Sequence, residues 1–382
     1  MAKRLMRKSL CAAGMAVSLM VPASAAYAVA DVLETPAMKS DLAPKRLLND
    51  AVRAGDRILA AGERGHIIYS DDNGKTWVQG DVPVSTTLTG ISFGTETHGW
   101  AVGHSGVILH TNDAGATWQL QMTGEDAARL AIAAKEEQAE AIQERIDEAP
   151  EDEKGDLEWA LDDIYFALDN LKSDLDIGPV NPLLDIWFEN ERHGIAVGAY
   201  GMALQTRDGG QTWQYMADEL DNPQSFHLND VARVTGGALV IVGEAGQVHV
   251  SADNGGSWER RESPYDGSLF GVLGTGQMNE MLIFGLRGNM FISSDLGRTW
   301  RAITNTAGAT LNSGAVPDKN EVVLVGNGGT VLFSANGAES FREYFRDDRE
   351  GIMDVVPVSG NNLLLFGEGG VKRTDARGRN LQ

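Results

Sequence analysis

The sequence predicts an all-β fold, a seven-bladed β-propeller with an inserted acidic α-helical hairpin. Three observations lead to this prediction. A motif of the form Ser/Thr-x-Asp-x-Gly-x-Thr/Ser-Trp occurs five times, and a sixth, worn copy follows near the end of the chain. The copies recur with a period near 42 residues, which is typical of propellers built from four-stranded blades. One interval is much longer and leaves room for an insertion of about 54 residues.

The motif copies, which we call boxes, end in aromatic residues that are 41, 95, 45, 42 and 41 residues apart. The box Asp suits hydrogen bonds to N–H groups of its own turn, the Gly takes a position that a side chain would block, and the Trp packs between sheets. We therefore interpret the boxes as structural. A calcium loop is the functional alternative, but the spaced acids and closing Glu of such a loop are missing. The box residues are Asp72, Gly74, Trp77, Asp113, Gly115, Trp118, Asp208, Gly210, Trp213, Asp253, Gly255, Trp258, Asp295, Gly297 and Trp300, and the worn copy runs from Ser334 to Phe341.

Residues 1–30 are predicted to be a secretory signal peptide. A basic start is followed by a short apolar run at residues 10–21 and by several small residues suited to cleavage. A retained membrane anchor is the alternative, but the apolar run is short for a span. The only cysteine, Cys11, lies in this segment. We therefore expect an exported, periplasmic protein that is soluble after cleavage, with no disulfide and no direct membrane insertion.

Residues 31–382 are predicted to form the propeller. Each unit has an apolar first strand, a second strand that ends in Gly, a tight turn, a third strand, a box, and a fourth strand that begins at the box Trp. The seventh unit stops near residues 371–373 and has no box. We expect residues 31–36 to supply its outer strand, because this pairing would join the two chain ends and remove two open sheet edges.

Residues 125–176 interrupt the repeat between blades two and three. Helical apolar spacing on both sides of a break at residues 150–155 predicts a hairpin of two helices. Because the segment follows a fourth strand and precedes a first strand, we expect it on the face that carries the turns between second and third strands. The second helix has a predicted apolar stripe of Leu157, Trp159, Leu161, Ile164, Tyr165, Leu168 and Leu171, which either packs internally or contacts a partner.

Charge restricts the class of partner. The formal net charge is −22, and it becomes −26 without the four basic residues Lys3, Arg4, Arg7 and Lys8. The insertion alone has 18 acids and 5 bases, a net charge of −13. Such a field disfavours nucleic acid and anionic membrane surfaces. We expect a protein partner, a membrane complex with a basic exposed surface.

Two sets of residues are candidates for binding, and no catalytic, cofactor-binding or metal-binding residue is predicted. The first strands place four aspartates near the axis, Asp50, Asp185, Asp230 and Asp354. They are either residues small enough to fit a crowded central channel or the lining of an acidic channel that binds a ligand. The residues in the turns after the second strands differ from one unit to the next, while the surrounding repeat is kept. Such variation is found in recognition surfaces and also in ordinary solvent-exposed turns. The candidate partner-binding residues are Glu63, Arg64, His104, Tyr200, Glu244, Arg287 and Glu368 in these turns, and Trp159 and Tyr165 in the insertion.

The repeat at residues 98–103 and 111–118 resembles the Asp-box (BNR) repeat and, more specifically, the photosystem II assembly and stability factor family, whose bacterial members occur well beyond phototrophs. The resemblance covers residues 45–375 except the insertion. It implies an exported seven-bladed propeller that binds partner proteins and assists membrane-complex assembly without catalysis or cofactors. The acidic insertion departs from the simple family pattern, and nothing else in the chain indicates photosynthesis.

Asp-box propellers also include sialidases, so a glycoside hydrolase or a carbohydrate-binding module is the alternative. A sialidase-like site needs three arginines, a Tyr activated by Glu, and an acid. We expect such arginines to project from several first strands, and we assign only Arg233 to one. The N-terminal Arg-Ile-Pro signature of sialidases is also missing. An exposed aromatic residue such as Tyr200 is the feature that a carbohydrate-binding module would use.

Overall fold

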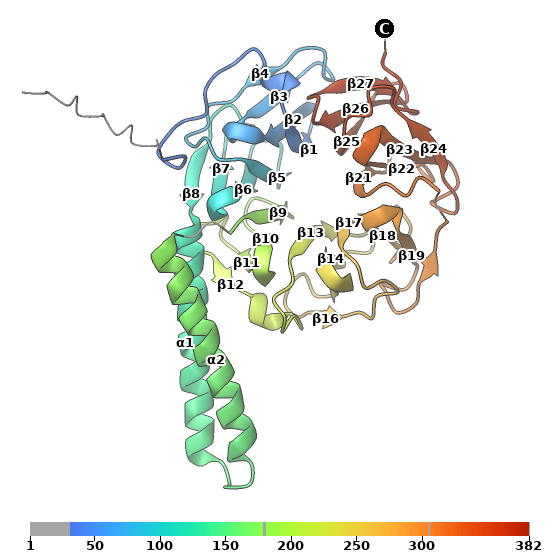
Figure 1. Cartoon of the computed structure of the whole chain (residues 1–382). Helices are drawn as coiled ribbons and strands as arrows, with labels where there is room; N and C mark the ends of the chain where they lie inside the picture. The colour runs from blue at the N-terminus through green and yellow to red at the C-terminus, as the bar shows by residue number, and fades with distance from the viewer. Residues whose placement is uncertain (1–30, 179–180, 305, 382) are drawn as a thin grey trace, which may run out of the picture. The chain divides into compact units, whose positions relative to one another are not determined.

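The computed structural model describes residues 31–178, 181–304 and 306–381, and residues 32–382 form one compact unit. Seven antiparallel sheets surround a common axis in this unit, and two helices form a hairpin at its edge (Figure 1). Six sheets have four strands and the seventh has three. The predicted fold class, a seven-bladed propeller with a helical hairpin, is confirmed. The predicted signal peptide falls on residues 1–30 and lies outside the described residues.

In blades one to six, four strands follow one another in sequence order, with the first strand nearest the axis. The strands of blades one to three are β1 (Leu48–Ala54), β2 (Arg57–Gly62), β3 (Ile67–Ser70), β4 (Val78–Gln79), β5 (Leu88–Phe93), β6 (Gly99–Gly103), β7 (Ile108–Thr111), β8 (Gln119–Met122), β9 (Leu183–Phe188), β10 (Gly194–Gly198), β11 (Ala203–Thr206) and β12 (Gln214–Tyr215). Those of blades four to seven are β13 (Leu228–Arg233), β14 (Leu239–Gly243), β15 (Val248–Ser251), β16 (Glu259–Arg260), β17 (Leu269–Gly274), β18 (Met281–Gly285), β19 (Met290–Ser293), β20 (Arg301–Ala302), β21 (Leu311–Ala315), β22 (Val322–Gly326), β23 (Thr330–Ser334), β24 (Arg342–Phe345), β25 (Ile352–Val358), β26 (Asn362–Gly367) and β27 (Lys372–Asp375).

A β-bulge occurs near the start of the first strand in every blade. In β1, for example, Leu48 pairs with Gly62 and Asp50 pairs with Ala61, so Asn49 has no partner across the ladder. The same shift recurs in the other six first strands. A bulge turns two consecutive side chains toward the same side of a strand. Each blade can therefore direct two neighbouring side chains toward the axis and the next blade.

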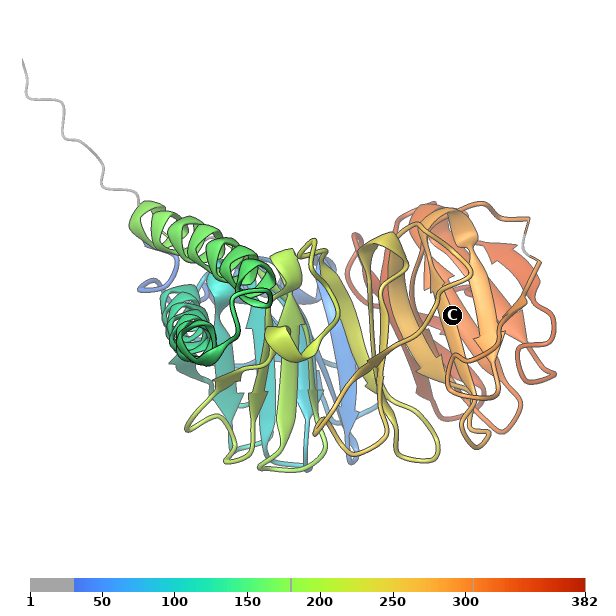
Figure 2. The same cartoon turned by 90° about the horizontal axis from the view of Figure 1, so that it is seen from below.

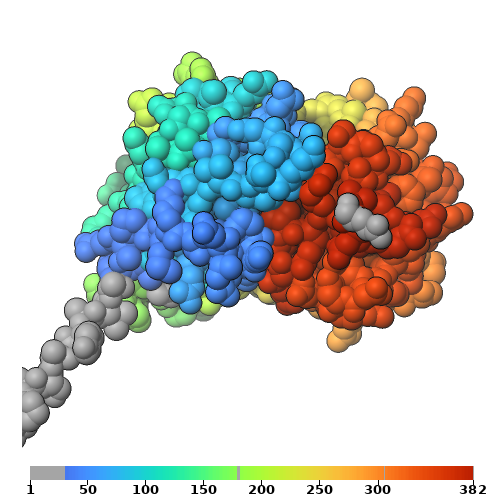
Figure 3. All heavy atoms as spheres, turned by 90° about the horizontal axis from the view of Figure 1, so that it is seen from above, coloured from blue at the N-terminus to red at the C-terminus, as the bar shows by residue number. Residues whose placement is uncertain are grey.

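The ring closes through packing between blades one and seven. Ile58 and Ile68 of blade one lie in one buried cluster with Leu364 and Phe366 of blade seven. The N–H group of Ala51 also donates to the Asp354 carboxylate at 2.9 Å. The first and last parts of the unit consequently lie side by side, blue against red in Figure 3.

The prediction that residues 31–36 form the outer strand of blade seven is wrong. This leader instead lies against blade one, where the N–H group of Ala37 donates to the Val82 carbonyl and the N–H group of Ser85 donates to the Val32 carbonyl. The C-terminal tail fills the outer position of blade seven. Thr374 forms a β-bridge with Asn380, and the Leu381 N–H donates to the carbonyl of Arg373 in β27. The tail follows β27 directly, so a short turn brings it to this edge. Pairing with the leader would require the two chain ends to meet, which costs more conformational entropy than closing a short turn.

The insertion consists of α1 (Gly124–Glu148) and α2 (Lys154–Ile177), between β8 and β9. Thr123 caps α1, because its hydroxyl accepts from the Asp126 N–H while the Asp126 side chain accepts from the Thr123 N–H. The root of α1 lies against the turn His104–Gly106, so closely that a Cβ on Gly106 would lie 2.5 Å from the Gly124 Cα. Figure 2 shows the hairpin on the same side of the blades as the short 3-10 turns. Of the described helices, none is long and apolar enough to cross a membrane.

Candidate binding surfaces

The box carboxylates are bonded within their own turns. Asp72 accepts from the N–H groups of Lys75 and Thr76 at 2.9 Å each, and from the Thr76 hydroxyl at 2.7 Å. The boxes centred on Asp113, Asp208, Asp253 and Asp295 repeat the two bonds to the residue four positions later. Side-chain hydrogen bonds from Ser257 and Thr299 lower the pKa of Asp253 and of Asp295 to about 2. These oxygens are therefore committed to the turns.

The four axial aspartates connect neighbouring blades. Asp50 accepts from the Ile91 N–H at 2.7 Å, and Asp354 accepts from the Ala51 N–H at 2.9 Å. Asp185 and Asp230 make the equivalent bonds to Val231 and Val272 of the next blade, at 2.9 and 2.6 Å. Burial raises the pKa of all four carboxyls, to about 6 for Asp354. Of the two possibilities for the axis, the hydrogen bonds support an architectural role between blades.

A second set of axial bonds was not predicted from the sequence. The bulged residue of four first strands bonds to a backbone carbonyl of the next blade, as when the Asn49 amide donates to the Leu88 carbonyl at 2.7 Å. Thr89, Asn229 and Asn312 make the same bond. The repeated Leu-Asn at residues 48–49, 228–229 and 311–312 is the signal that could have revealed this set. A cavity of about 220 Å³ remains at the axis, and no cluster of three or more His, Asp or Glu side chains among the described residues could hold a metal ion.

The turns between second and third strands lie on one face of the ring, one turn to a blade (Figure 2). Arg64, Tyr200 and Arg287 occupy the centres of 3-10 turns at Glu63–Gly65, Ala199–Gly201 and Leu286–Gly288, with φ of 57°, 54° and 57°. Their side chains and that of His104 are exposed, and Glu63 is half-buried. Tyr200 is 63% exposed, and its ring centre lies 4.9 Å from that of His227.

Two of the predicted turn-face acids have partners within the chain. Glu244 accepts from the backbone N–H of His227 at 3.0 Å and lies 2.7 Å from the His227 ring nitrogen. Glu368 accepts from the Gly351 N–H at 2.8 Å. Each acid thus fixes the segment that enters the first strand of its own blade. Glu368 stays exposed in spite of this bond, and Arg64, His104, Tyr200 and Arg287 are the exposed turn-face residues that do not hold such a segment.

The predicted stripe on the second helix divides between two faces. Leu161, Ile164 and Leu168 are buried against Ala139 and Ile146 of α1. Trp159 and Tyr165 do not share that face, since they are 74% and 50% exposed. The prediction of a single stripe is therefore wrong for these two residues. The sequence could not distinguish the faces, because apolar residues occur on nearly every side of α2.

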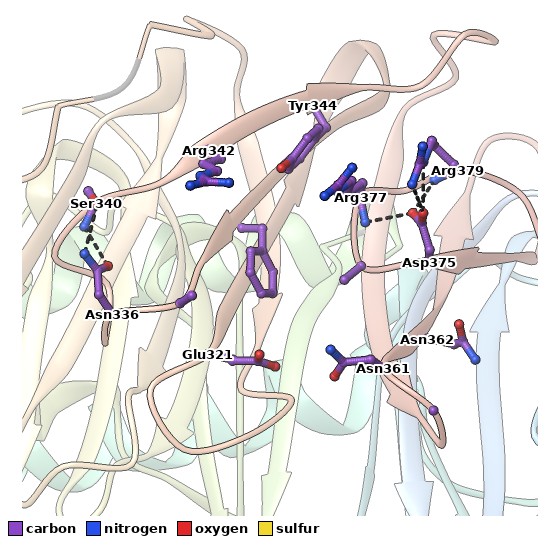
Figure 4. A pocket seen from close by; sticks show the side chains of 14 residues that line it. Glu321, Asn336, Ser340, Arg342, Tyr344, Asn361, Asn362, Asp375, Arg377 and Arg379 are labelled. Atoms are coloured by element: carbon purple, nitrogen blue, oxygen red, sulfur yellow. Dashed lines mark hydrogen bonds and ion pairs between the residues drawn. The ribbon is translucent and has the colours of Figure 1, made fainter.

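A polar groove of about 730 Å³ lies between blades six and seven (Figure 4). Arg342 and Tyr344 enter it from β24, and Arg377 enters it from the turn after β27, with its guanidinium carbon 5.8 Å from the centre of the Tyr344 ring. The side chains of Arg342 and Arg377 have no ion pair with a described residue. Arg379, in contrast, is bound by Asp375 at 2.7 Å. The other polar lining residues are Glu321, Asn336, Ser340, Asn361 and Asn362.

The sequence analysis missed this groove. Its residues come from two blades and are separated by up to about 58 positions, so no local motif unites them. The available signal was the concentration of arginine near the end of an acidic chain. The assignment of arginines to first strands was also incomplete, because Arg53 lies in β1 as well as Arg233 in β13. Arg53 donates to the Pro357 carbonyl and Arg233 pairs with Glu189, so both have partners near the strand ends.

The fold and the boxes define the class of protein as a seven-bladed propeller of the Asp-box type. A model of the BNR/Asp-box repeat matches residues 68–79. The chain belongs to the family described as Photosynthesis system II assembly factor YCF48, whose model matches residues 77–140 and 169–371. Residues 141–168, the distal half of the hairpin, fall outside that match.

The relatives and structural neighbours agree with this family. The chain is 30% identical over 144 residues to photosystem II stability/assembly factor HCF136 of Oryza sativa subsp. japonica, and 24% identical over 192 residues to photosystem II assembly lipoprotein Ycf48 of Synechococcus sp. (strain CC9902). These alignments cover 35% and 50% of this chain, and 34% and 57% of the relatives, so the chain spans a third to just over half of their lengths. A structure described as YCF48 bound to D1 peptide has a TM-score of 0.57 and 16% identity over 86% of this chain and 92% of the other. YCF48 from Cyanidioschyzon merolae has a TM-score of 0.58 and 12% identity over 87% and 96% of the two chains. At these identities the structural neighbours support the fold.

Proposed function

We propose that this protein is a non-catalytic, exported scaffold that binds a periplasmic segment of a membrane complex and assists assembly of that complex. Membership of the assembly-factor family supports the class of function. A family neighbour solved with a bound peptide supports peptide recognition by such a ring. The boxes and axial acids support a role without catalysis, because their carboxylates bond within the fold.

The observation that carries the proposal is the groove between blades six and seven. In a chain of net charge −22, two guanidinium groups that form no ion pair with a described residue lie on either side of the Tyr344 ring there (Figure 4). Guanidinium groups bind carboxylates in bidentate geometry, and the ring and amide groups add apolar and polar contacts. A volume near 730 Å³ suits a few residues of an extended peptide. We propose that the groove takes a carboxylate-bearing peptide segment.

In this proposal, other surfaces of the partner contact the acidic insertion and the turn face of the ring. The acidic insertion steers a basic surface of the membrane complex toward the ring, and the exposed turn-face residues Arg64, His104, Tyr200 and Arg287 offer further contacts on the face that carries the insertion (Figure 2). Opposite charges at two sites fix the orientation of a partner better than one charged site does. The signal-like sequence of residues 1–30 supports the proposed export and periplasmic location, and fractionation of the envelope tests that part directly.

Cross-linked capture from the native envelope tests the groove. Arg342→Ala together with Arg377→Ala removes both free guanidinium groups, and Arg298→Ala with Arg301→Ala is the matched control, because both of these blade-five arginines are exposed. We expect the unaltered chain and the control to capture the same membrane protein, and the groove variant to lose most of it. Equal capture by all three chains would place the contact outside the groove.

A carboxylated sugar is the second candidate ligand, since the groove gathers arginines, Tyr344, Glu321 and Asp375, the residue types that a sialidase uses. These groups lie on outer strands and loops of two blades, whereas a sialidase-like site would draw on first strands. One arginine is also neutralised by Asp375. Retention on a panel of sialylated and uronic glycans, lost in the groove variant, would favour the sugar over the peptide.

A further inference from the structure

Three large apolar side chains form an exposed line along α2. Trp159, Phe166 and Ile177 are 74%, 70% and 80% exposed. The separations of 7 and 11 residues correspond to about two and about three helical turns, so all three point in nearly the same direction. We call these three residues the outer stripe. It extends for about 27 Å along the helix, from near the tip of the hairpin to its root.

The outer stripe has no role in holding the hairpin together. The buried residues Leu161, Ile164 and Leu168 lie on the opposite side of α2 and make the contact with α1. Isolated exposed apolar residues are ordinary on a protein surface, but aromatic residues are enriched at the centres of protein interfaces, and contiguous exposed apolar patches mark interaction sites. The stripe is therefore a candidate contact surface that the intrachain packing leaves open.

The charges around the stripe identify what would cover it. The acids of α2 form no ion pair with a described residue, and its two lysines are already paired, Lys154 with Glu151 and Lys172 with Glu136. An acidic helix with an apolar line complements a helix that has the opposite charge beside its own apolar line. A second copy of this chain would bring two insertions of net charge −13 together. The unpaired acids of α2 are Asp156, Glu158, Asp162, Asp163, Asp169, Asp174 and Asp176.

The root of the hairpin holds this surface in place. Ala127 of α1 is buried in the core between blades two and three. Lys135 pairs with Asp218, in the turn that follows β12, at 2.5 Å. A rooted helix pair presents its outer face with little loss of conformational freedom on binding. Trp159 and Phe166 also lie in the segment that the family match leaves out, so this surface is an addition to the common ring.

We propose that the outer stripe of α2 docks a basic amphipathic helix of the partner protein. This proposal rests on the scaffold function proposed above and deepens it by naming the class of partner segment. The apolar line of the partner helix covers Trp159, Phe166 and Ile177. Its lysines and arginines lie beside the unpaired acids of α2.

A labelled synthetic peptide tests the proposal on the full chain. The probe is a Leu/Lys amphipathic helix of about 18 residues, the length of the outer stripe, and fluorescence anisotropy measures its Kd. Trp159→Ala with Phe166→Ala is the test variant, and Met278→Ala is the matched control because it removes a large apolar side chain that is 68% exposed elsewhere on the ring. Alanine favours a helix, so the test variant keeps its fold, which circular dichroism verifies. We expect binding to weaken at least about ten-fold in the test variant and less than about two-fold in the control.

Two further peptides make the outcome decisive. A Leu/Glu peptide should not bind, and a scrambled Leu/Lys peptide of the same composition should bind less tightly than the amphipathic one. Equal binding of the scrambled peptide, or of the test variant, overturns the proposal. Sedimentation gives the remaining outcome, because a dimer that disappears in the test variant would make a second copy the occupant. The variant with Arg342→Ala and Arg377→Ala should bind the peptide normally, so failure of the groove and failure of the stripe are distinguishable.

Discussion

Replacement of Asp354 by Asn should stabilise the propeller at neutral pH and leave its stability unchanged in acid. Burial raises the pKa of the Asp354 carboxyl from its usual 3.8 to about 6. Between these values the folded chain binds more protons than the unfolded chain, so stability falls as the pH rises from about 4 to about 6. Above that window the full cost of the buried charge is present. A shift of about 2 pKa units corresponds to about 3 kcal/mol.

Asn is suited to this test because it keeps the hydrogen bonds. Its side-chain oxygen can accept from the Ala51 N–H, and its amide can donate to the Ser313 hydroxyl, which donates to Asp354 in the native chain. The substitution also removes a charge that raises the pKa of Asp50. We therefore expect the Asp354→Asn variant to be more stable by up to about 3 kcal/mol at pH 8 and equal to the native chain near pH 4.

Urea unfolding, followed by tryptophan fluorescence at pH 4, 6 and 8, measures the difference in the free energy of unfolding. Asp253→Asn is the control of opposite sign, because hydrogen bonds hold the pKa of this box carboxyl at about 2. Its stabilisation is present above the usual 3.8 and is lost as the pH falls toward 2, so Asn should destabilise the chain at pH 8. A variant Asp354→Asn that is less stable at pH 8, or that differs equally at all three pH values, would refute the reasoning.

Three other substitutions test the fold. Gly115→Ala should cost about 1–3 kcal/mol of stability, because the residue has φ of +83° and a Cβ would lie 2.3 Å from Leu59. Gly155→Ala should gain about 0.5 kcal/mol, since no heavy atom lies within 4 Å of the added Cβ. Thermal melts compare the two variants. Asn229→Ala removes an axial bond between blades four and five and should cost about 1 kcal/mol in urea unfolding. A chain that ends at Gly378 should expose β27 to proteolysis, because the tail that pairs with this strand is missing.

The interface between blades five and six illustrates how far a repeat can vary. At the positions of Asn49 and Asp50, blade five has Phe270 and Gly271, which offer no side-chain hydrogen bond to the next blade. A Cβ on Gly271 would lie 2.4 Å from the Phe284 ring, so this ring takes the space that an Asp uses elsewhere. Leu282 and Phe284 pack with Leu324 of blade six instead. The sequence shows that blade five has Gly where other blades have Asp. The reason is the contact of Gly271 with the Phe284 ring, which only the structure reveals.

The sequence by itself determined the number of blades, the box turns, and the presence and place of the helical hairpin. These features depend on short-range periodicity, on turn chemistry within eight residues and on helical spacing, which can be read along the chain. The Asp-box pattern also sufficed to identify the family. All of these predictions concern residues that interact with close neighbours in the sequence.

Only the tertiary structure decided how distant residues meet. The bulges direct Asn49 and Asp50 toward the next blade, packing divides α2 into a buried face and the outer stripe, and the tail rather than the leader fills the edge of blade seven. The groove likewise brings Arg342 and Arg377 together from two sheets. In each case several arrangements satisfy the local pattern equally well. The choice among them depends on which apolar surfaces and backbone groups find partners once the ring has closed.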